Sequence, residues 1–450
     1  MRRWLVVITV AAFGLLFGAA MPASAQGFGV YEQSTCAMGR AGTGVAAPCQ
    51  DGSGVYFNPA GLSFDQKQVS LGAALIGPQG DFTNDTTKVV SALKKAWYPV
   101  PNVYASSPLS PRLAAGIGVF APYGLTSEWP LTSEGRFLAY KSVVQGIYVQ
   151  PTLAWKASER MSIGVGVDLT YVNLQLLQRV DLSKQAITGT PYTFANLGVK
   201  AGTDFADIDL SGHALSLGAH FGVLYKASDR MTLGARVMTG QKVKVDDGEI
   251  KTQQISTPYV LPIPLGATLP AGTPIDALVK PLFAAGGKLS NQSAKTSLPL
   301  PLQATAGLAY QATPKVMLLA DYQFVQWSKF DKLVVDGEFL DTTNHEGYRD
   351  THGLRLGTEI ALGEKTVARA GIILHGAAAP DETVTPLLPE GSRRELSVGF
   401  GRQLTSSMRI DAAYVYLYQP ERAGRSQEGP NNGVYNFMAH LFGIAFSFGF

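Results

Sequence analysis

The sequence predicts an all-β fold, a transmembrane antiparallel β-barrel of about 14 strands with a small N-terminal hatch, or plug, inside it. Three observations predict this fold class. Charged residues make up 16% of the 450 residues, against roughly 25% in soluble domains. Beyond Ala25, no stretch of about 20 residues is apolar enough for a membrane-spanning helix. Several segments instead alternate between large apolar residues and small or polar ones, which is typical of strands with one face in lipid.

The first 25 residues have the features of a secretory signal peptide. Arg2 and Arg3 precede an apolar run that begins at Trp4, and Ala23-Ser24-Ala25 forms an A-x-A cleavage site before polar sequence. This pattern favours a cleaved signal over a retained anchor helix. Removing both arginines from the 37 basic residues leaves 35 against 34 acidic ones. With a net charge this close to zero, the sequence predicts no nucleic-acid partner.

The alternation is clearest near the C-terminus. From Phe442 to Phe450, every second residue is large and apolar, and the residues between are Gly, Ala or Ser. The same period of two recurs at 161–171 and at 410–418, where Tyr414, Tyr416 and Tyr418 share one face. We interpret the apolar face as lipid-facing and the other as lumenal.

Turn signals between such runs delimit fourteen candidate strands, an even number as bacterial barrels require. Short turns alternate with long loops, which places both ends of the barrel on the periplasmic side. The candidate strands are 67–77, 100–107, 112–120, 141–156, 160–176, 210–226, 230–245, 298–312, 315–336, 350–362, 365–376, 392–404, 407–418 and 436–450. Charged residues within them, such as Arg236, Arg355, Arg369 and Asp411, fall on the predicted lumenal face.

The segment 26–65 is too long for a simple lead into the first strand and too rich in glycine to form its own domain. A barrel of about fourteen strands has an interior that is either plugged or open as a pore. We therefore expect 26–65 to form the hatch and 66–450 to form the barrel with long extracellular loops. Cys36 and Cys49 lie in this hatch, and export to an oxidising compartment leaves both a disulfide and two free thiols open.

Five segments, taken in order, resemble the outer-membrane long-chain fatty acid transporter family, the FadL, TodX and OmpP1 group. The resemblance extends along most of the mature chain. Its motifs are Gly39-Arg40-Ala41-Gly42-Thr43-Gly44, the hatch motif Asn58-Pro59-Ala60 with its flanking residues, Ala121-Pro122-Tyr123-Gly124-Leu125-Thr126, Gln326-Trp327-Ser328-Lys329-Phe330 and Tyr348-Arg349-Asp350-Thr351-His352.

The resemblance implies a monomeric channel in the bacterial outer membrane, in contact with lipid and lipopolysaccharide, that takes up hydrophobic compounds passively. In this family the ligand enters an apolar groove between two outer loops, moves to a site in the lumen and leaves sideways through the wall. We expect long-chain fatty acids, with aromatic or alkane hydrocarbons as the alternative. Arg349 and Arg179 stand where the resemblance places residues that hold the ligand carboxylate, and Arg393 and Arg394 are a lesser alternative. Gly116 and Gly118 are candidate positions for the kink at the exit, because glycine permits a bulge.

The loop 246–297 agrees with a groove, because it is long and almost uncharged between 255 and 287. An exposed loop this apolar needs a partner, which is either a ligand or a neighbouring loop. We expect the second wall in the loop 121–140. The candidate groove residues are Trp129, Leu131, Phe137 and Leu138 on one side and Tyr259, Leu261, Ile263, Leu278, Leu282 and Phe283 on the other.

Two other classes of function remain as alternatives. An enzyme is disfavoured because the six histidines show no H-E-x-x-H spacing and the chain has no G-x-S-x-G motif, although residues that meet only in space escape this test. We therefore expect no catalytic residues, no metal and no cofactor. A general porin, which leaves an aqueous channel, is disfavoured by the hatch segment and the apolar loop.

Overall fold

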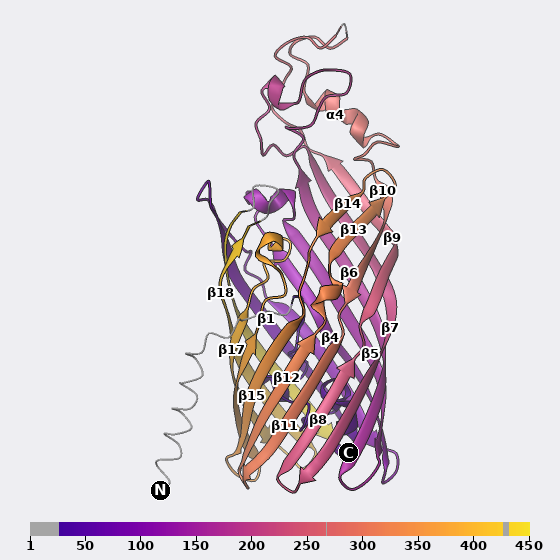
Figure 1. The fold of residues 1–450 in the computed structure, drawn as a ribbon, viewed down its shortest axis with the longest axis vertical. Coiled ribbons are helices and arrows are strands. Elements are labelled where there is room, and N and C mark those ends of the chain that lie inside the picture. Colours follow the sequence, from indigo (N-terminus) through magenta and orange to yellow (C-terminus); the bar gives the residue numbers. More distant parts are fainter. Residues whose placement is uncertain (1–26, 267, 426–431) are drawn as a thin grey trace.

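The computed structural model describes residues 27–266, 268–425 and 432–450. The predicted signal peptide, 1–25, lies outside the described residues. The chain forms one antiparallel sheet that curls into an elongated barrel, with a group of loops standing above one end (Figure 1). No helix among the described residues is long and apolar enough to cross a membrane.

The predicted barrel of fourteen strands is confirmed. Several wall strands are divided into two segments, so the sheet has 19 named strands. The first half contains β1 (Gln68–Asn84), β2 (Val90–Ala92), β3 (Tyr98–Pro108), β4 (Leu113–Glu128), β5 (Lys141–Lys156), β6 (Met161–Val180), β7 (Ala206–Ser228), β8 (Met231–Met238) and β9 (Gln241–Gln254). The second half contains β10 (Gln292–Leu300), β11 (Gln303–Thr313), β12 (Val316–Val325), β13 (Lys332–Gly337), β14 (Thr342–His345), β15 (Thr351–Ala361), β16 (Thr366–His375), β17 (Arg393–Gln403), β18 (Met408–Gly424) and β19 (Gly433–Gly449).

The barrel closes between its first and last strands. β1 pairs with β19 along its whole length, from Gln68 opposite Gly449 to Asn84 opposite Gly433. The sequence predicted a loop at 246–297, but the observed loop is shorter. β9 continues to Gln254, and β10 begins at Gln292. In the added parts of both strands, buried and exposed residues alternate. The apolar composition of the loop hid this alternation in the sequence.

The two faces of the wall follow the predicted period of two. On β6, Ser162, Asp168 and Thr170 are buried, whereas Val165, Val167 and Leu169 between them are exposed. The exposed apolar residues form the lipid-facing band. The predicted lumenal charges Arg236, Arg355, Arg369 and Asp411 are all buried.

The segment before β1 contacts the inner wall on several sides. It contains α2 (Thr35–Met38), α3 (Gly54–Phe57) and the 3-10 helix η1 (Pro59–Phe64). Wall glycines lie directly against it: Gly164 of β6 against Pro59, Gly399 of β17 against Gly39, and Gly443 of β19 against Met38. Since these strands surround the segment, residues 27–65 occupy the lumen, and we call them the hatch.

The remaining helices lie in the loops. They are α4 (Asp276–Phe283) and the 3-10 helices η2 (Glu134–Phe137), η3 (Ala195–Leu197), η4 (Trp327–Lys329) and η5 (Asp381–Thr383). Figure 1 shows α4 in the group of loops that projects beyond the strands.

Candidate functional site

An apolar cavity lies in the lumen on the loop side of the hatch. Its empty volume is about 770 Å³, part of which is open to solvent. Lys295 is the one residue of the lining with an ionisable side chain. The lining comprises Phe28, Leu125, Ser142, Val143, Val144, Leu174, Gln175, Leu176, Leu210, Ser211, Gly212, Val245, Gly248, Ala294, Lys295, Thr296, Leu298, Phe330, Leu333, Val335, Leu387 and Leu388. We call this space the lumenal cavity.

One side of the lumenal cavity is an aromatic cluster around Phe28. The Phe28 ring centroid lies 4.8 Å from that of Trp327, 5.9 Å from that of Phe330 and 6.0 Å from that of Tyr123, all edge-on. Tyr348 joins the cluster, with its ring centroid 4.9 Å from that of Phe330. These five residues are buried. The first described residues of the hatch therefore separate the cavity from the rest of the lumen.

The same N-terminal segment pairs with a kinked part of β4. Val30 N–H donates to Pro122 O over 2.9 Å, Gly124 N–H donates to Phe28 O over 2.9 Å, and Gly29 and Tyr123 form an antiparallel bridge. The register of β4 with β5 shifts between Phe120 and Tyr123. Pro122 has no N–H to continue a ladder. The kink therefore turns β4 toward the hatch.

The kink is not at the predicted glycines. Gly116 and Gly118 pair in regular register with Ser106 and Tyr104 of β3. The β3–β4 ladder ends at Val103 opposite Val119, although β1 continues to pair with β3 as far as Tyr98. Beyond Val119 this side of the wall lacks a ladder within the described residues. Because glycines inside a regular ladder look the same in sequence as glycines at a bulge, composition alone misplaced the interruption.

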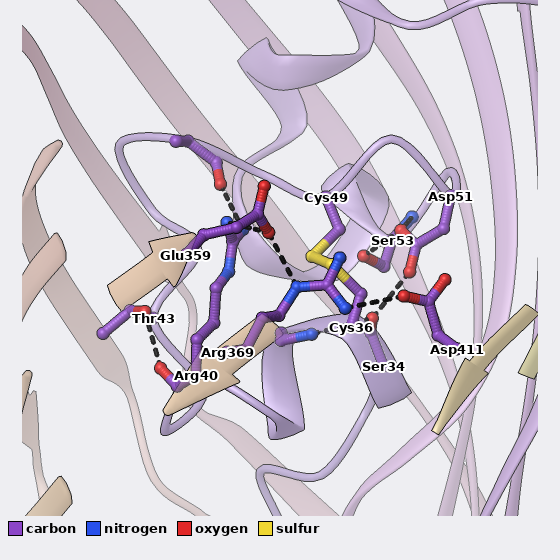
Figure 2. The surroundings of a disulfide bond; sticks show 12 residues. Ser34, Cys36, Arg40, Thr43, Cys49, Asp51, Ser53, Glu359, Arg369 and Asp411 are labelled. Carbon is purple, nitrogen blue, oxygen red and sulfur yellow. Dashed lines mark hydrogen bonds and ion pairs between the residues drawn. A yellow bond between two sulfur atoms is a disulfide. The ribbon is translucent and has the colours of Figure 1, made fainter. Parts of the chain in front are cut away.

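An ion pair joins the hatch to the wall, further ion pairs link the neighbouring strands, and a disulfide closes a loop within the hatch (Figure 2). Arg40 Nη1 lies 3.6 Å from Glu359 Oε2, and the same carboxylate oxygen lies 2.7 Å from Arg369 Nε. Arg369 Nη1 also lies 2.6 Å from Asp411 Oδ1. A disulfide joins Cys36 and Cys49, which decides between the two alternatives that the sequence left open.

The Asn-Pro-Ala motif joins two parts of the hatch to β7. Asn58 Nδ2 donates to Val45 O over 2.7 Å and to Val223 O over 3.0 Å, and Asn58 Oδ1 accepts from Ala60 N–H over 3.1 Å. Pro59 begins η1, where a missing N–H costs no helix bond. All three residues of the motif are buried, and their contacts serve to fix the hatch in place.

The structure does not bring the two predicted groove walls together. Trp129 is buried in the same cluster as Phe28, and its indole Nε1 donates to Pro386 O over 2.9 Å. Leu261 instead packs in a separate cluster with residues of the loop 181–205, such as Phe194. Tyr259, Leu278, Leu282 and Phe283 are half-buried against that second cluster. Ile263 and Leu131 are exposed, and Phe137 and Leu138 are half-buried.

The loop 181–205 lies between the two predicted walls. Arg136 Nε is 2.8 Å from Asp204 Oδ1, and Arg136 Nη2 donates to Gly202 O. Arg136 belongs to the loop 121–140, so this loop contacts the loop 181–205. An apolar loop packs on its nearest apolar neighbour, which is the alternative that the sequence also allowed.

The predicted carboxylate ligands occupy the loop end of the barrel. Arg349 has an exposed side chain and makes no ion pair with any described residue, while its backbone N–H donates to Ala378 O over 2.9 Å. Arg179 is in β6, with Nε 3.7 Å from Asp207 Oδ1 and no hydrogen-bond partner for Nε in the described part of the chain. Arg393 donates from Nη2 to Gly27 O over 2.9 Å and so holds the hatch.

Two loop carboxyl groups have perturbed acidities. Burial raises the pKa of Glu346 to about 7. Burial also raises the pKa of Glu390, although its carboxylate accepts hydrogen bonds from the N–H groups of Ala378, Ala379 and Gly27, which oppose the increase. Glu390 therefore ties the start of the hatch to the loop 376–392.

Comparisons with known proteins agree with this architecture. The family model "Outer membrane protein transport protein (OMPP1/FadL/TodX)" matches residues 16–450. A long-chain fatty acid transport protein of Escherichia coli O6:H1 is 25% identical over 444 residues, covering 94% of each chain. Outer membrane protein P1 of Haemophilus influenzae is 25% identical, covering 89% of this chain and 87% of the relative.

Solved structures show the same fold. A Pseudomonas aeruginosa FadL homologue superposes with a TM-score of 0.79 at 20% identity, covering 94% of this chain and 100% of the other. The Pseudomonas putida toluene transporter TodX superposes with a TM-score of 0.69 at 16% identity, covering 95% and 99%. These relatives are transport channels and not enzymes. The chain therefore belongs to the OmpP1/FadL/TodX family of transport proteins for hydrophobic compounds in the bacterial outer membrane.

Proposed function

We propose that this protein lets long-chain fatty acids cross the outer membrane passively, by way of the lumenal cavity. The observation that carries the proposal is the apolar lining of a cavity that begins near the loops and ends on the Phe28 cluster. Burial of an alkyl chain yields about 0.8 kcal/mol per methylene. A cavity of this kind therefore retains a long chain and gives little to a small polar solute.

Arginines at the loop end supply the match for the carboxylate. An arginine fork is suited to a carboxylate because it offers parallel N–H donors. Arg179 has an unmet Nε donor, and Arg349 has no ion-pair partner among the described residues. Both therefore have capacity for an anionic head group, while the chain of the ligand lies in the cavity.

The exit is lateral, between β3 and β4. The ladder there stops at Val119, and the kink at Ala121–Pro122 is paired with the hatch segment around Gly29. Movement of Phe28 and Gly29 therefore changes both the end of the cavity and the kinked strand. A sideways exit keeps the alkyl chain out of water throughout its passage.

Binding to detergent-purified protein tests this proposal. The ligands are oleate and the neutral hydrocarbon hexadecane, and the chains are the native protein, Arg349→Ala, Arg179→Ala and Arg402→Ala. Arg402 is an exposed arginine at the opposite end of the barrel wall, so it controls for general loss of positive charge. We expect oleate binding to weaken in the first two variants and to persist in the third.

Other results favour other functions. Equal binding of both ligands in every variant overturns the arginine assignment and favours hydrocarbon uptake, the second candidate. That candidate draws support from the lining of the cavity, where Lys295 is the one ionisable residue. Binding of neither ligand overturns both and favours a general porin.

A further inference from the structure

The barrel wall has a second interruption, between β7 and β9. The ladder of β7 with β9 ends at Ser211 opposite Glu249, and the ladder of β7 with β8 begins at His220 opposite Met238. On this side, residues 212–219 of β7 have no ladder partner among the residues that the structure describes. At the end of this stretch next to His220, Thr239 bonds to Ala219. The Thr239 N–H donates to Ala219 O and the Thr239 hydroxyl accepts from Ala219 N–H, both over 2.9 Å.

Side chains, and not ladder hydrogen bonds, fill this interruption. A Cβ placed on Gly212 would lie 2.5 Å from Val245 Cγ1, and one placed on Gly218 would lie 2.5 Å from Gln241 Nε2. Val243 and Val245 are buried, with 0% and 1% exposure. Glycine on β7 thus makes room for large side chains from β9. Opening the wall here requires rotation of side chains, whereas opening a laddered pair of strands breaks several hydrogen bonds.

The interruption lies between the lumenal cavity and the lipid. Gly212, Val245 and Gly248 line the cavity. On the outer face, Leu215 and Leu217 are 80% and 66% exposed. Their partners on β6, Tyr171 and Leu169, are also exposed and belong to the apolar band. The same short piece of wall therefore faces an apolar cavity on one side and the lipid on the other.

Two lysines stand on the outer face of β9 beside the interruption. Lys242 and Lys244 alternate with buried Val243 and Val245, so they point away from the lumen. Both are exposed, and neither has an ion-pair partner among the described residues. The adjacent bulge carries the exposed Asp246 and Asp247. Other exposed residues with ionisable side chains near it are His213, Glu249, which pairs with Lys251, and Lys295, which lies opposite Asp336 of β13.

We propose that the β7–β9 interruption is a second lateral exit, used by ligands with an anionic head and an apolar chain. The chain passes where Val243 and Val245 now lie, and the ammonium groups of Lys242 and Lys244 bind the carboxylate as it reaches the membrane surface. Lysine suits this position because its apolar stem lies along the wall while its charge reaches toward the polar interface. The proposal rests on the proposed function, since it needs a fatty acid in the lumenal cavity.

Locking the interruption with a disulfide tests the exit. Gly212→Cys and Val245→Cys are combined, because a methyl group of Val245 is the atom that lies closest to a side chain introduced at position 212. Formation of the bond is verified by mass spectrometry. The controls are each single variant and the pair Val223→Cys with Ala235→Cys, which bridges two strands that are already in register. The readout is the initial rate of radiolabelled oleate uptake by cells that lack other transporters of this family.

We expect the oxidised Gly212/Val245 pair to slow oleate uptake several-fold relative to its single variants, and the control pair to leave the rate unchanged. The exit between β3 and β4 stays open in the locked chain, so an unchanged rate would overturn a second exit that carries most of the oleate, while leaving the proposed function intact. Absence of oleate uptake by the native chain would overturn both. The two failures are therefore distinguishable.

Substitution of the lysines tests their part separately. The double variant Lys242→Gln, Lys244→Gln is expected to take up oleate several-fold more slowly and hexadecane at the native rate, and Lys242→Arg, Lys244→Arg is expected to restore oleate uptake. Equal loss for both ligands, or no loss for oleate, would overturn the binding of the carboxylate by these lysines.

Discussion

The ring of Phe28 meets the ring of Trp327 edge-on, with centroids 4.8 Å apart. Phe28 belongs to the hatch. Trp327 belongs to η4, which directly follows β12 and lies almost 300 residues further along the sequence. Their contact closes the lumenal cavity on the side of the hatch. Access from the cavity to the remainder of the lumen is therefore controlled by a few aromatic side chains.

Phe28→Ala is expected to weaken this closure. Loss of a buried phenyl ring from a packed cluster costs about 3–5 kcal/mol, and here the loss falls on the contacts of the N-terminal segment. We expect a higher ion conductance than that of the native protein in planar lipid bilayers. Phe339→Ala is the matched control, because Phe339 is 38% exposed. Equal conductance of all three proteins would contradict a sealing role for Phe28.

The disulfide is expected to stabilise the hatch and not the barrel. Cys36 and Cys49 are 13 residues apart, and a cross-link that closes a loop of this size contributes about 3 kcal/mol. In Cys36→Ser with Cys49→Ser, we expect faster hydrogen exchange in 34–57 and unchanged protection along the β1–β19 ladder, which serves as the internal control. Equal exchange in the hatch with and without the disulfide would show that the wall contacts alone fix it.

Arg369 is expected to be important for the stability of the barrel near the hatch. Its side chain is 1% exposed and lies between Glu359 and Asp411. Removal of one partner from a buried ion pair typically costs about 3–5 kcal/mol, because the remaining charge is left without compensation. We expect Arg369→Met to lower the temperature at which the detergent-solubilised protein unfolds. Lys251→Ala, which breaks an exposed pair with Glu249, should leave that temperature unchanged, and similar behaviour of the two variants would refute the argument.

Glu346 is expected to make the packing of the loops depend on pH. Its pKa in the folded protein is about 7, against an ordinary value of 4.5, so the folded state binds this proton more strongly than the unfolded state. The stabilising effect is full below about pH 4.5 and is lost as the pH rises through 7. We therefore expect Glu346→Gln to show a smaller fall in unfolding temperature between pH 5 and pH 8 than the native protein.

Glu338→Gln is the control for Glu346→Gln, because Glu338 is an exposed residue of the neighbouring connection, between β13 and β14. This variant should keep the native dependence on pH. If Glu346→Gln also kept it, burial of Glu346 would not be its origin.

The barrel was predictable because each strand carries its own evidence. Alternation from Met161 to Tyr171 reports the two environments of β6 without knowledge of its neighbours. The interruptions in the wall were not predictable in this way, since they depend on which strand supplies the partner. The kink was predicted at Gly116 and Gly118. It lies instead at Ala121–Pro122, where β4 pairs with the hatch.

The loops illustrate the same limit. The sequence showed that Leu261 and its neighbours need an apolar partner, and the partner is the loop of Phe194 and not that of Trp129. The choice among apolar surfaces is made by distance in the folded molecule, which composition does not contain. The Phe28 cluster was missed for a related reason, because its members come from four distant segments, and only the motifs that contain Tyr123, Trp327 and Tyr348 gave any signal.

The β1–β19 ladder has a consequence for the order of events in assembly. Its two strands come from opposite ends of the described sequence, so the wall is incomplete until β19 has formed. Until then β1 and β18 each present an unsatisfied edge, and such edges pair readily with other chains. A truncated protein that lacks β19 would therefore be found in aggregates and not as a leaky barrel in the membrane.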